Sequence, residues 1–291
     1  MSAVRWALVV AALAADSSAP LGRDVIRSVK VDGKPRVYHL HVPPRAGAKR
    51  LPAVINIHGL GSNALEQEAL SRMNALADRE GFYVLAPEGL GTGQSFNAGM
   101  CCGEALVNKV DDVGYLRAML DDASKDFAID SRRVFATGMS NGGFMAHRLA
   151  CELSDRIAAI APVAGVLGLT ECHPARPVSV LQFHGTMDAL VQYGGGGPLA
   201  TFPSVESVIK GWAARDGCGS DREQVEKSGD VTCERFVGCP KAIDVELCRV
   251  DGGGHTWPGA IPIPRYGKTS DSISATETMW RFFRAHPMKL H

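Results

Sequence analysis

The sequence has no block of five or six charges of one sign, and its 31 Lys and Arg residues balance 31 Asp and Glu residues over 291 positions. This even balance excludes the basic surface with which proteins bind nucleic acid. There is also no internal repeat and no Pro-rich or Ser-rich linker to divide the chain. Hydrophobic residues make up 45% of it, which is ordinary for a globular protein and excludes extensive disorder. We therefore expect one large core.

No apolar run near the start is long enough to cross a bilayer, which takes about 20 such residues. The run over 6–13 follows Arg5 and leads into Ala12-Leu13-Ala14, a small-x-small cleavage pattern. This pattern predicts a signal peptide over residues 1–14, no membrane anchor, and secretion to an extracellular or periplasmic location. Residues 15–291 are then expected to form a single catalytic domain. A frayed apolar N-terminal helix is the alternative interpretation of the start.

Cysteine pairs with the C-x-x-C spacing of zinc sites are absent, which disfavours a bound metal. The chain has eight cysteines, and an even number behind a predicted signal peptide favours disulfides in an oxidising compartment. The segments VTCERF and DVELCRV are typical of two hairpin strands, which would set Cys233 near Cys248. Cys218 would then pair with Cys239, as one hypothesis among many possible connectivities.

Strand and helix patterns alternate along the rest of the chain. An antiparallel hairpin is predicted over 24–43, turning at Asp32-Gly33. Short apolar runs that suit buried strands then alternate with amphipathic stretches that suit helices. This alternation predicts an α/β fold of the α/β-hydrolase type, with a mostly parallel central sheet and helices on both faces. The strand runs cover 53–59, 82–89, 133–138, 157–165 and 178–185, and the helical stretches cover 64–81, 112–127, 141–154, 205–217 and 274–286.

The most specific motif is Gly138-Met139-Ser140-Asn141-Gly142, which fits the pattern G-x-S-x-G. Small residues flank the serine where a strand turns so sharply into a helix that larger side chains would clash, and the turn leaves the hydroxyl exposed. A strand pattern before the motif and a helix pattern after it support this interpretation. Ser140 is therefore the predicted nucleophile. The alternative, a serine that only caps the following helix, leaves the two glycines unexplained.

A serine hydroxyl needs a neighbouring base, and in the α/β-hydrolase arrangement the chain order is serine, acid, histidine. Of the nine histidines, His255 follows three glycines in the segment DGGGHTWPG, where a loop without side-chain bulk can approach the nucleophile. His184 ends an apolar strand and is expected to be a structural histidine. His255 is therefore the predicted general base, with a surface histidine in a flexible loop as the alternative.

The predicted acid is Asp188, because the triad acid is expected at the carboxyl end of a strand that follows the nucleophile. Asp244 and Asp251 are rival acids. Asp244 falls in the proposed cysteine hairpin, and Asp251 lies only four residues before the predicted base. Asp188 is preferred for these reasons.

Two backbone N–H groups are expected to bind the oxyanion of the tetrahedral intermediate. One belongs to Asn141, the residue after the nucleophile. The other is expected in the loop after an early strand, in the segment INIHGLGSNA. Leu60 is the preferred donor there and Gly61 is the next choice.

These segments resemble the secreted esterases that include polyhydroxybutyrate depolymerases and bacterial feruloyl esterases of carbohydrate esterase family one. The matching pieces are HGLGSNA, FNAGMCCG, VDDVGYLRAML, ATGMSNGGFMAHRLACE, IAAIAPVAG, HGTMDALVQYGGG and GGGHTWPG, in the family's order. The resemblance implies one catalytic α/β-hydrolase domain with Ser140, Asp188 and His255 as its triad. It also implies that neither a metal nor a cofactor is needed.

By the same resemblance, the Cys101-Cys102 segment packs beside the active site, and Trp257 helps to line the substrate pocket. The sequence departs from the family at Phe96, where tryptophan is expected, and at Gln192, where proline is usual. Both positions are expected in loops near the inferred site. They therefore bear on the substrate more than on the chemistry.

We expect a serine carboxylesterase whose partner is an ester substrate, with neither nucleic acid nor membrane as a partner. A feruloyl (hydroxycinnamoyl) esterase is preferred, because the sequence shows no appended polymer-binding module. A polyhydroxybutyrate or oligomer depolymerase is the alternative. A non-catalytic binding protein on the same fold, a peptidase and a thioesterase are the other classes left open.

Overall fold

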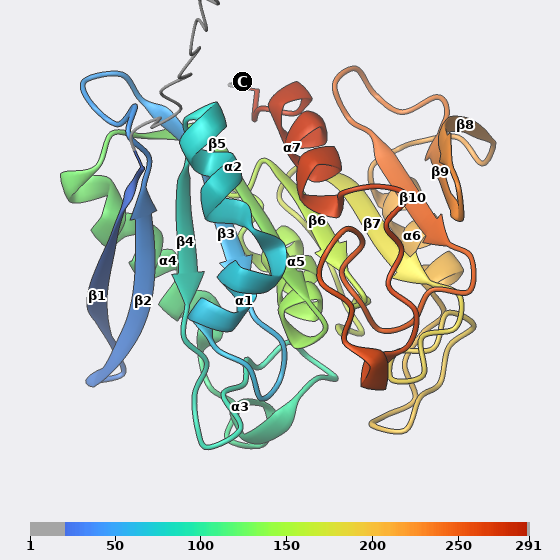
Figure 1. Ribbon diagram of the computed structural model, residues 1–291, viewed down its shortest axis with the longest axis horizontal. Helices are drawn as coiled ribbons and strands as arrows, with labels where there is room; N and C mark the ends of the chain where they lie inside the picture. Colours follow the sequence, from blue (N-terminus) through green and yellow to red (C-terminus); the bar gives the residue numbers. More distant parts are fainter. Residues whose placement is uncertain (1–20, 290–291) are drawn as a thin grey trace, which may run out of the picture.

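The computed structural model of the protein describes residues 21–289, and the ten strands in this range form one sheet (Figure 1). Across the sheet the order is β1-β2-β4-β3-β5-β6-β7-β10-β9-β8. The six central strands run parallel, and an antiparallel pair completes each edge. The predicted mostly parallel sheet is confirmed. The strands are β1 (Arg23–Val31), β2 (Lys34–Val42), β3 (Leu51–Ile57), β4 (Tyr83–Pro87), β5 (Ile129–Met139), β6 (Ala159–Val163), β7 (Ser179–Gly185), β8 (Arg222–Ser228), β9 (Val231–Phe236) and β10 (Val245–Val250).

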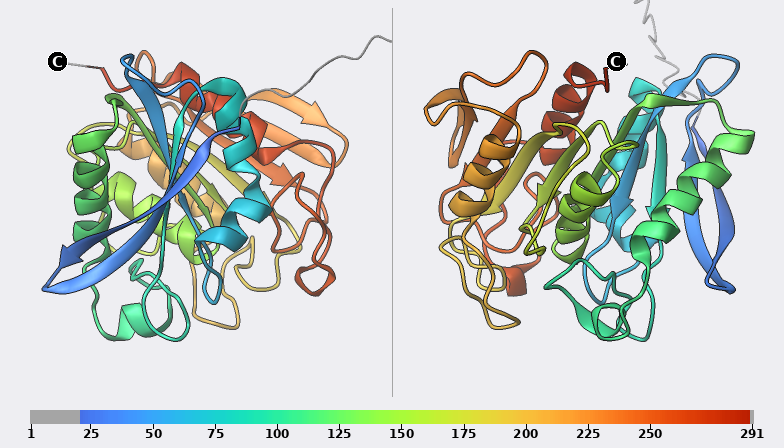
Figure 2. Two further views of the ribbon diagram at one scale, coloured as in Figure 1. Left: turned by 60° about the vertical axis from the view of Figure 1, so that its left-hand side comes forward. Right: turned by 180° about the vertical axis from the view of Figure 1, so that it is seen from behind.

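Helices cover both faces of this sheet, as predicted. Parallel strands bury both faces, so each face needs a helical layer. One layer is α1 (Ala64–Ser71), α2 (Met73–Glu80) and α7 (Ala275–Ala285), and the other is α4 (Asp112–Asp126), α5 (Asn141–Glu152) and α6 (Val205–Arg215) (Figures 1 and 2). The short helix α3 (Gly103–Val107) and the 3-10 turn η1 (Pro264–Tyr266) lie in loops.

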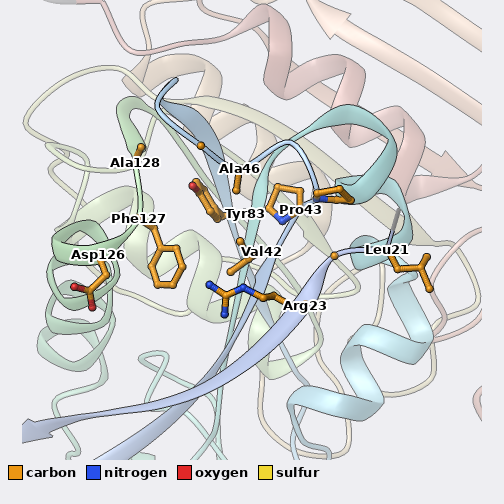
Figure 3. A pocket seen from close by; sticks show the side chains of 12 residues that line it. Leu21, Arg23, Val42, Pro43, Ala46, Tyr83, Asp126, Phe127 and Ala128 are labelled. Carbon is orange, nitrogen blue, oxygen red and sulfur yellow. The ribbon is translucent and has the colours of Figure 1, made fainter. Parts of the chain in front are cut away.

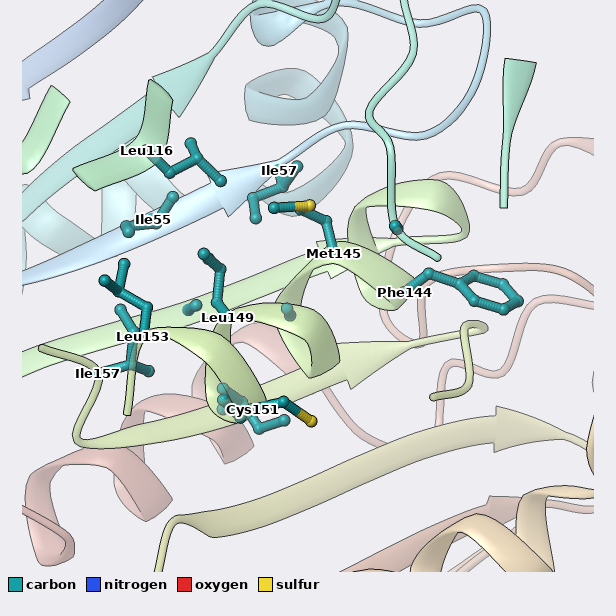
Figure 4. Packing of buried hydrophobic residues seen from close by; sticks show 14 of the residues in the cluster. Ile55, Ile57, Leu116, Phe144, Met145, Leu149, Cys151, Leu153 and Ile157 are labelled. Carbon is teal, nitrogen blue, oxygen red and sulfur yellow. The ribbon is translucent and has the colours of Figure 1, made fainter. Parts of the chain in front are cut away.

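Alternate residues of the central strands face two hydrophobic clusters. On β3, Ile55 and Ile57 belong to the cluster that includes α4, α5 and α6, whereas Val54 belongs to the cluster that includes α2 and α7. Successive side chains of a strand point to opposite faces, so an unbroken apolar run supplies both clusters. Figure 4 shows part of the first cluster, which Ile55 and Ile57 share with Leu149 of α5.

The single helix predicted over 64–81 is wrong in one respect, because the structure has two helices there. Arg72 separates α1 from α2 and has φ 55° and ψ 29°, the left-handed conformation. The hydroxyl of the buried Ser71 accepts the N–H of Met73 at 3.3 Å and the side-chain N–H of Asn56 at 2.9 Å. A serine side chain that binds nearby backbone competes with the helical hydrogen bonds. The apolar periodicity does not report this local competition.

All eight cysteines form disulfides, which are Cys101–Cys102, Cys151–Cys172, Cys218–Cys239 and Cys233–Cys248. The two predicted pairs are confirmed. The antiparallel register of β9 and β10 sets Cys233 directly opposite Cys248. Edge strand β8 was not predicted, because its sequence REQVEKS is mostly polar and lacks the apolar run that marks a buried strand.

Four disulfides are typical of a protein that works in an oxidising compartment outside the cytosol. Within residues 21–289, none of the helices has the length and apolar character that crossing a membrane requires. The signal peptide predicted over residues 1–14 lies outside the described residues.

Loops from the carboxyl ends of the parallel strands gather at the lower end of Figure 1. They follow β3, β4, β7 and β10, and the turn from β5 into α5 opens at the same edge. In open α/β sheets, ligands bind at the carboxyl ends of the strands. The predicted site residues all belong to these loops and to this turn.

Candidate active site

Ser140 lies in the turn between β5 and α5. Its φ of 55° and ψ of −121° are outside the regions that residues other than glycine prefer, so the turn is strained. The turn is held by the Ser140 N–H, which donates to the carbonyl of Val163 at 2.9 Å, and by the Ser140 carbonyl, which accepts from Phe144 at 2.9 Å. The hydroxyl caps no N–H of the helix. Helix capping therefore does not explain why a serine occupies this turn.

The two glycines of the motif allow this turn to pack on the end of β3. A Cβ atom at Gly138 or at Gly142 would collide with the backbone of Ile57. Gly165, just after β6, is equally close, and a Cβ there would meet the carbonyl of Ser140 at 2.8 Å. The pattern G-x-S-x-G is thus a packing requirement at this position.

Asp188 follows β7 and is almost completely buried. Its Oδ1 atom accepts the N–H groups of Leu190 and Val191, both at 2.9 Å. Its Oδ2 atom lies 2.8 Å from Nδ1 of His255. Burial alone would raise the pKa of Asp188, but the hydrogen bond and charge of His255, with further contributions from His184 and the N–H of Val191, outweigh it and lower the pKa below its ordinary value. Asp188 is therefore a buried carboxylate.

The loop after β10 holds His255 at two points. Nδ1 donates to Asp188, and the backbone N–H donates to the carbonyl of Tyr266 at 2.7 Å. The rings of His255 and Tyr266 are edge to face, with centroids 6.0 Å apart. Because Nδ1 carries the proton that Asp188 accepts, Nε2 is left with a lone pair. The imidazole can therefore accept a proton at Nε2.

The glycines before His255 make room for two neighbouring backbones. A Cβ atom at Gly254 would collide with the carbonyl of Tyr266. A Cβ atom at Gly185, at the end of β7, would collide with Gly253 and Gly254. We expected the glycine run to approach the nucleophile, and the contacts that it permits are with the end of β7 and with Tyr266.

The two rival acids have other partners. Asp244 accepts a hydrogen bond from Nε2 of His286 at 2.9 Å. Asp251 accepts one from Nε of Arg249 at 2.9 Å. Of the three carboxylates, Asp188 is the one that bonds to the predicted base.

A small, mainly apolar pocket of about 10 Å³ lies beside the loop of His255. Met139, the residue before Ser140, lines this pocket together with His255 and Trp257. The structure thus brings the three predicted triad residues to one edge of the sheet. The other lining residues are Leu70, Thr256, Ile261, Ile263, Tyr266 and Thr269.

Trp257 forms its wall of this pocket from inside the core. The side chain is 1% exposed, and its indole N–H donates to the hydroxyl of Thr276 at 3.0 Å. Contact with substrate at this residue stays a prediction. Sequence reasoning missed Ile261, Ile263 and Tyr266, because a loop without periodicity does not indicate a pocket wall. The exposed apolar run IPIP was the signal available, and Ile261 is 79% exposed.

The N–H groups of Leu60 and Asn141 have no acceptor among residues 21–289. The first N–H groups of a helix lack intrahelical partners, which leaves that of Asn141 available at the start of α5. Gly61, the second choice in the early loop, donates its N–H to the carbonyl of Gly93 at 2.8 Å. A Cβ atom at Gly59 would lie 3.4 Å from Cβ of Ser140, so the early loop borders Ser140. Leu60 is therefore the better candidate donor of the two.

His58 orients the peptide group that carries the Leu60 N–H. Nε2 of His58 accepts the N–H of Gly89 at 2.9 Å, so Nδ1 carries the proton and donates to the carbonyl of Gly59 at 2.7 Å. The C=O and N–H of a trans peptide point in opposite directions. The bond to Gly59 therefore directs the Leu60 N–H away from His58. Burial lowers the pKa of His58 to about 4 and keeps the ring neutral.

The side chain of Asn141 joins α5 to the loop that contains Phe96, Cys101 and Cys102. Its Oδ1 accepts the N–H of Phe96 at 2.8 Å, and its Nδ2 donates to the carbonyl of Phe96 at 2.9 Å. Nδ2 also lies 3.6 Å from Sγ of Cys101. The ring of Phe96 is buried beside that of His58, with centroids 4.8 Å apart. This departure from the family pattern thus lies in the core and not on the surface of the pocket.

Another cavity, of about 420 Å³, lies at the opposite ends of the strands from Ser140 (Figure 3). Tyr83, which begins β4, and Phe127, just before β5, line it together with Arg23. These positions are at the amino ends of parallel strands, whereas Ser140 lies at a carboxyl end. Nowhere in residues 21–289 do three or more His, Cys, Asp or Glu side chains gather in a way that could hold a metal.

A mostly parallel sheet that presents a serine at a strand-to-helix turn, with a hydrogen-bonded Asp and His at the same edge, defines the α/β-hydrolase class. The family model described as Esterase PHB depolymerase matches residues 36–212. The chain belongs to this esterase family.

Relatives of the chain include named feruloyl esterases. Feruloyl esterase B of Piromyces equi is 34% identical over 222 residues, which cover 72% of this chain and 40% of that protein. Feruloyl esterase D of Neurospora crassa is 26% identical over 272 residues, which cover 88% of this chain and 84% of that protein. A solved structure of an acetyl xylan esterase from Aspergillus awamori matches with a TM-score of 0.64 and 16% identity, over 90% of this chain and 99% of that one. This last similarity shows the shared fold.

Proposed function

We propose that this protein is a secreted serine carboxylesterase that hydrolyses feruloyl and related hydroxycinnamoyl esters. The observation that carries the proposal is the hydrogen bond between Asp188 and His255 at the sheet edge where the strained turn presents Ser140. Membership of an esterase family and the named feruloyl esterases among the relatives support the substrate class.

In the proposed mechanism, Nε2 of His255 takes the proton of the Ser140 hydroxyl as the oxygen attacks the ester carbonyl. Asp188 holds the ring in this tautomer and stabilises the imidazolium. The N–H groups of Leu60 and Asn141 bind the oxyanion. The protonated His255 then gives its proton to the leaving alcohol, and water activated by the same ring releases the acid from Ser140.

The side chains that line the cavity beside His255 match an aromatic acyl group in their chemistry, but the cavity itself holds only about 10 Å³ and must widen to admit one. Its walls include two aromatic rings, Trp257 and Tyr266, and two isoleucines, Ile261 and Ile263. Aromatic and branched apolar side chains contribute binding energy through buried area and ring contacts. The proposal therefore requires the loop of the exposed Ile261 and Ile263 to move outward, so that a hydroxycinnamoyl ring can lie against Tyr266.

Two serine variants test the nucleophile. Ser140→Ala should abolish hydrolysis of a nitrophenyl ester without lowering the melting temperature, because the hydroxyl caps no helix. Ser204→Ala is the matched control. Ser204 precedes the first residue of α6 as Ser140 precedes that of α5, and its hydroxyl accepts the N–H of Ser207 at 3.2 Å. That control should keep its activity and lose about 1 kcal/mol of stability. Substantial turnover by the Ser140→Ala variant would exclude the proposed nucleophile.

The substrate class is tested by comparing ferulate release from methyl ferulate with clearing of a polyhydroxybutyrate suspension. The proposal requires a higher kcat/KM on methyl ferulate than on short hydroxybutyrate esters. Rapid clearing of the polymer with slow release of ferulate would instead support the polyester depolymerase, the activity that the family description names.

Secretion is part of the proposal and rests on the four disulfides together with the signal peptide predicted over residues 1–14. Expression in a bacterial host should deliver the protein to the periplasm. N-terminal sequencing of that product should begin close to residue 15. An uncleaved N-terminus on the active protein would contradict this part.

A further inference from the structure

A chain of buried polar side chains runs from α6 to the loop of Asp188. It starts at Trp212 of α6, passes through His147 of α5, and continues on β7, where Gln182 and His184 point to the same face. All four side chains are at most 1% exposed. We call this set the Trp212–His184 chain. It plays no part in the mechanism above, and buried polar groups of this kind need an explanation.

The first link fixes a tautomer. The indole Nε1 of Trp212 lies 3.0 Å from Nδ1 of His147. An indole nitrogen is only a donor, so Nδ1 of His147 is an acceptor and the ring carries its proton at Nε2. Nε2 then donates to Oε1 of Gln182 at 2.9 Å. Burial lowers the pKa of His147 to about 3, so the ring stays neutral.

The second link joins Gln182 to His184 on β7. Nε2 of Gln182 lies 2.8 Å from the carbonyl of Gly165, an acceptor, which independently fixes the orientation of the amide. The other hydrogen of this amide has two neighbours at 3.3 Å, the carbonyl of Phe183 and Nδ1 of His184. Nε2 of His184 lies 2.7 Å from the carbonyl of Val191, which only accepts, so the neutral ring carries its proton at Nε2 and Nδ1 is left to accept from Gln182. Burial lowers the pKa of His184 as well.

The last link reaches the proposed triad acid. Nε2 of His184 donates to the carbonyl of Val191 at 2.7 Å, and it lies 3.4 Å from Oδ2 of Asp188. The N–H of Val191 in turn donates to Oδ1 of Asp188 at 2.9 Å. His184 thus anchors the loop whose N–H groups hold the carboxylate, and its Nε2 lies beside the oxygen that His255 uses. The reverse tautomer would face Asp188 and the Val191 carbonyl with a lone pair.

We propose that the Trp212–His184 chain is a positioning device, in which the Trp212 indole at one end and the Val191 carbonyl at the other hold His184 with its proton at Nε2 and thereby keep Asp188 in line with His255. The proposal rests on the proposed function for its catalytic consequence. The hydrogen-bond direction itself does not depend on any activity.

The tautomers are read directly by NMR of protein labelled with 15N at histidine. His147 and His184 should both be neutral at pH 7, with a protonated Nε2 and a bare Nδ1. The Nδ1 proton of His255, which Asp188 accepts, should give a protected resonance in the wild type and a broadened or shifted one in His184→Phe. A His184 ring protonated at Nδ1, or a His255 resonance unchanged in the variant, would overturn the proposal.

Kinetics separate positioning from general packing. His184→Phe keeps the ring volume and removes the donor, and it should lower kcat on methyl ferulate about 10-fold or more with little change in KM, because small misplacements of catalytic groups have effects of this order. His184→Gln, which retains an N–H at the end of the side chain, should recover most of the loss. Equal losses in the two variants, or kcat within about 2-fold of wild type in His184→Phe, would also overturn it.

A pair of tryptophan variants provides the matched control. Trp212→Phe should lower kcat, whereas Trp280→Phe should not, although Trp280 is also buried and donates its indole N–H, to Glu80 at 3.1 Å. A similar kcat in both variants would contradict the device. If the wild type hydrolyses no ester, the proposed function fails, while the NMR measurements still decide the hydrogen-bond direction and its effect on His255.

Discussion

Nδ1 of His255 lies 2.8 Å from Oδ2 of Asp188, although 67 residues separate the two in the chain. The parallel pairing of β7 with β10 explains this contact, because it sets Gly185 beside Val250 at the carboxyl ends of the two strands. Asp188 comes three residues after one strand and His255 five residues after the other. Two short loops from neighbouring strand ends therefore meet at one point.

Asp188→Asn should lower kcat by about 10⁴-fold while the fold is retained, because the amide no longer holds His255 in the required tautomer. The matched control is Asp244→Asn, since Asp244 also accepts a hydrogen bond from a histidine, His286. That variant should keep kcat within about 3-fold, because its partner is not in the site. Steady-state kinetics on a nitrophenyl ester measures both, and similar losses would contradict the choice of Asp188.

His58→Leu should lower kcat about 10- to 100-fold, because the Gly59 carbonyl loses the donor that orients the Leu60 N–H. It should also change how stability depends on pH. The folded pKa of His58 is about 4, against an ordinary value of 6.5, so the unfolded chain takes up this proton first as the pH falls. The stability that the neutral ring contributes is complete above pH 6.5 and is lost as the pH falls toward 4.

The pH effect is measured by urea unfolding of the wild type and His58→Leu between pH 7.5 and about 4. Across the window the wild type should lose up to about 1.4 kcal/mol per pH unit relative to the variant, which cannot bind that proton. Parallel pH curves for the two proteins would show that His58 is not the titrating group.

Tyr266→Ala should raise KM for methyl ferulate about 10-fold and leave KM for nitrophenyl acetate nearly unchanged. The reason is that the ring lines the pocket, whereas only the backbone carbonyl of Tyr266 holds the His255 amide. An acetyl group is too small to use the ring. Equal changes for both esters would indicate damage to the position of His255 instead of a substrate contact.

Replacing both Cys233 and Cys248 by alanine should lower the free energy of unfolding by about 3 kcal/mol, the value expected for closing a loop of this length. The two positions are 15 residues apart in the chain and face each other across β9 and β10. Denaturant titration under non-reducing conditions measures the loss. A loss below about 1 kcal/mol would mean that strand pairing alone holds this hairpin.

Asp112→Ala should cost about 3 to 5 kcal/mol, because it leaves the guanidinium of Arg36 buried without its partner. The two side chains are 0% and 4% exposed and their closest atoms are 2.8 Å apart. Burial raises the pKa of Asp112, and the charge of Arg36 opposes the rise. The double variant Arg36→Met with Asp112→Leu should recover most of the loss in urea unfolding, since replacing both charges removes the unpaired one. No recovery would show that another contact of Asp112 matters more.

Local patterns predicted much of this fold correctly, where the physical cause was also local. The hairpin turns at Asp32-Gly33 as expected, because these two residues adopt positive φ values of 50° and 76°. The apolar runs became parallel strands, because burial on both faces requires them to be apolar throughout. The break at Arg72 and the edge strand β8 were missed, since one depends on the buried contacts of Ser71 and the other on pairing with β9.

The motif G-x-S-x-G was enough to single out Ser140, because a sharp strand-to-helix turn needs glycine two residues before the serine and two residues after it, and that requirement is visible in the sequence. Which of Asp188, Asp244 and Asp251 bonds to His255 was settled only by the folded chain, because it depends on β7 and β10 being neighbours. The tautomer of His184 depends on its buried contacts with Gln182 and with the carbonyl of Val191, which no local pattern records. The predicted nucleophile thus follows from short-range sterics, whereas the contacts that orient Asp188 and His255 are set by how distant strands and their loops pack.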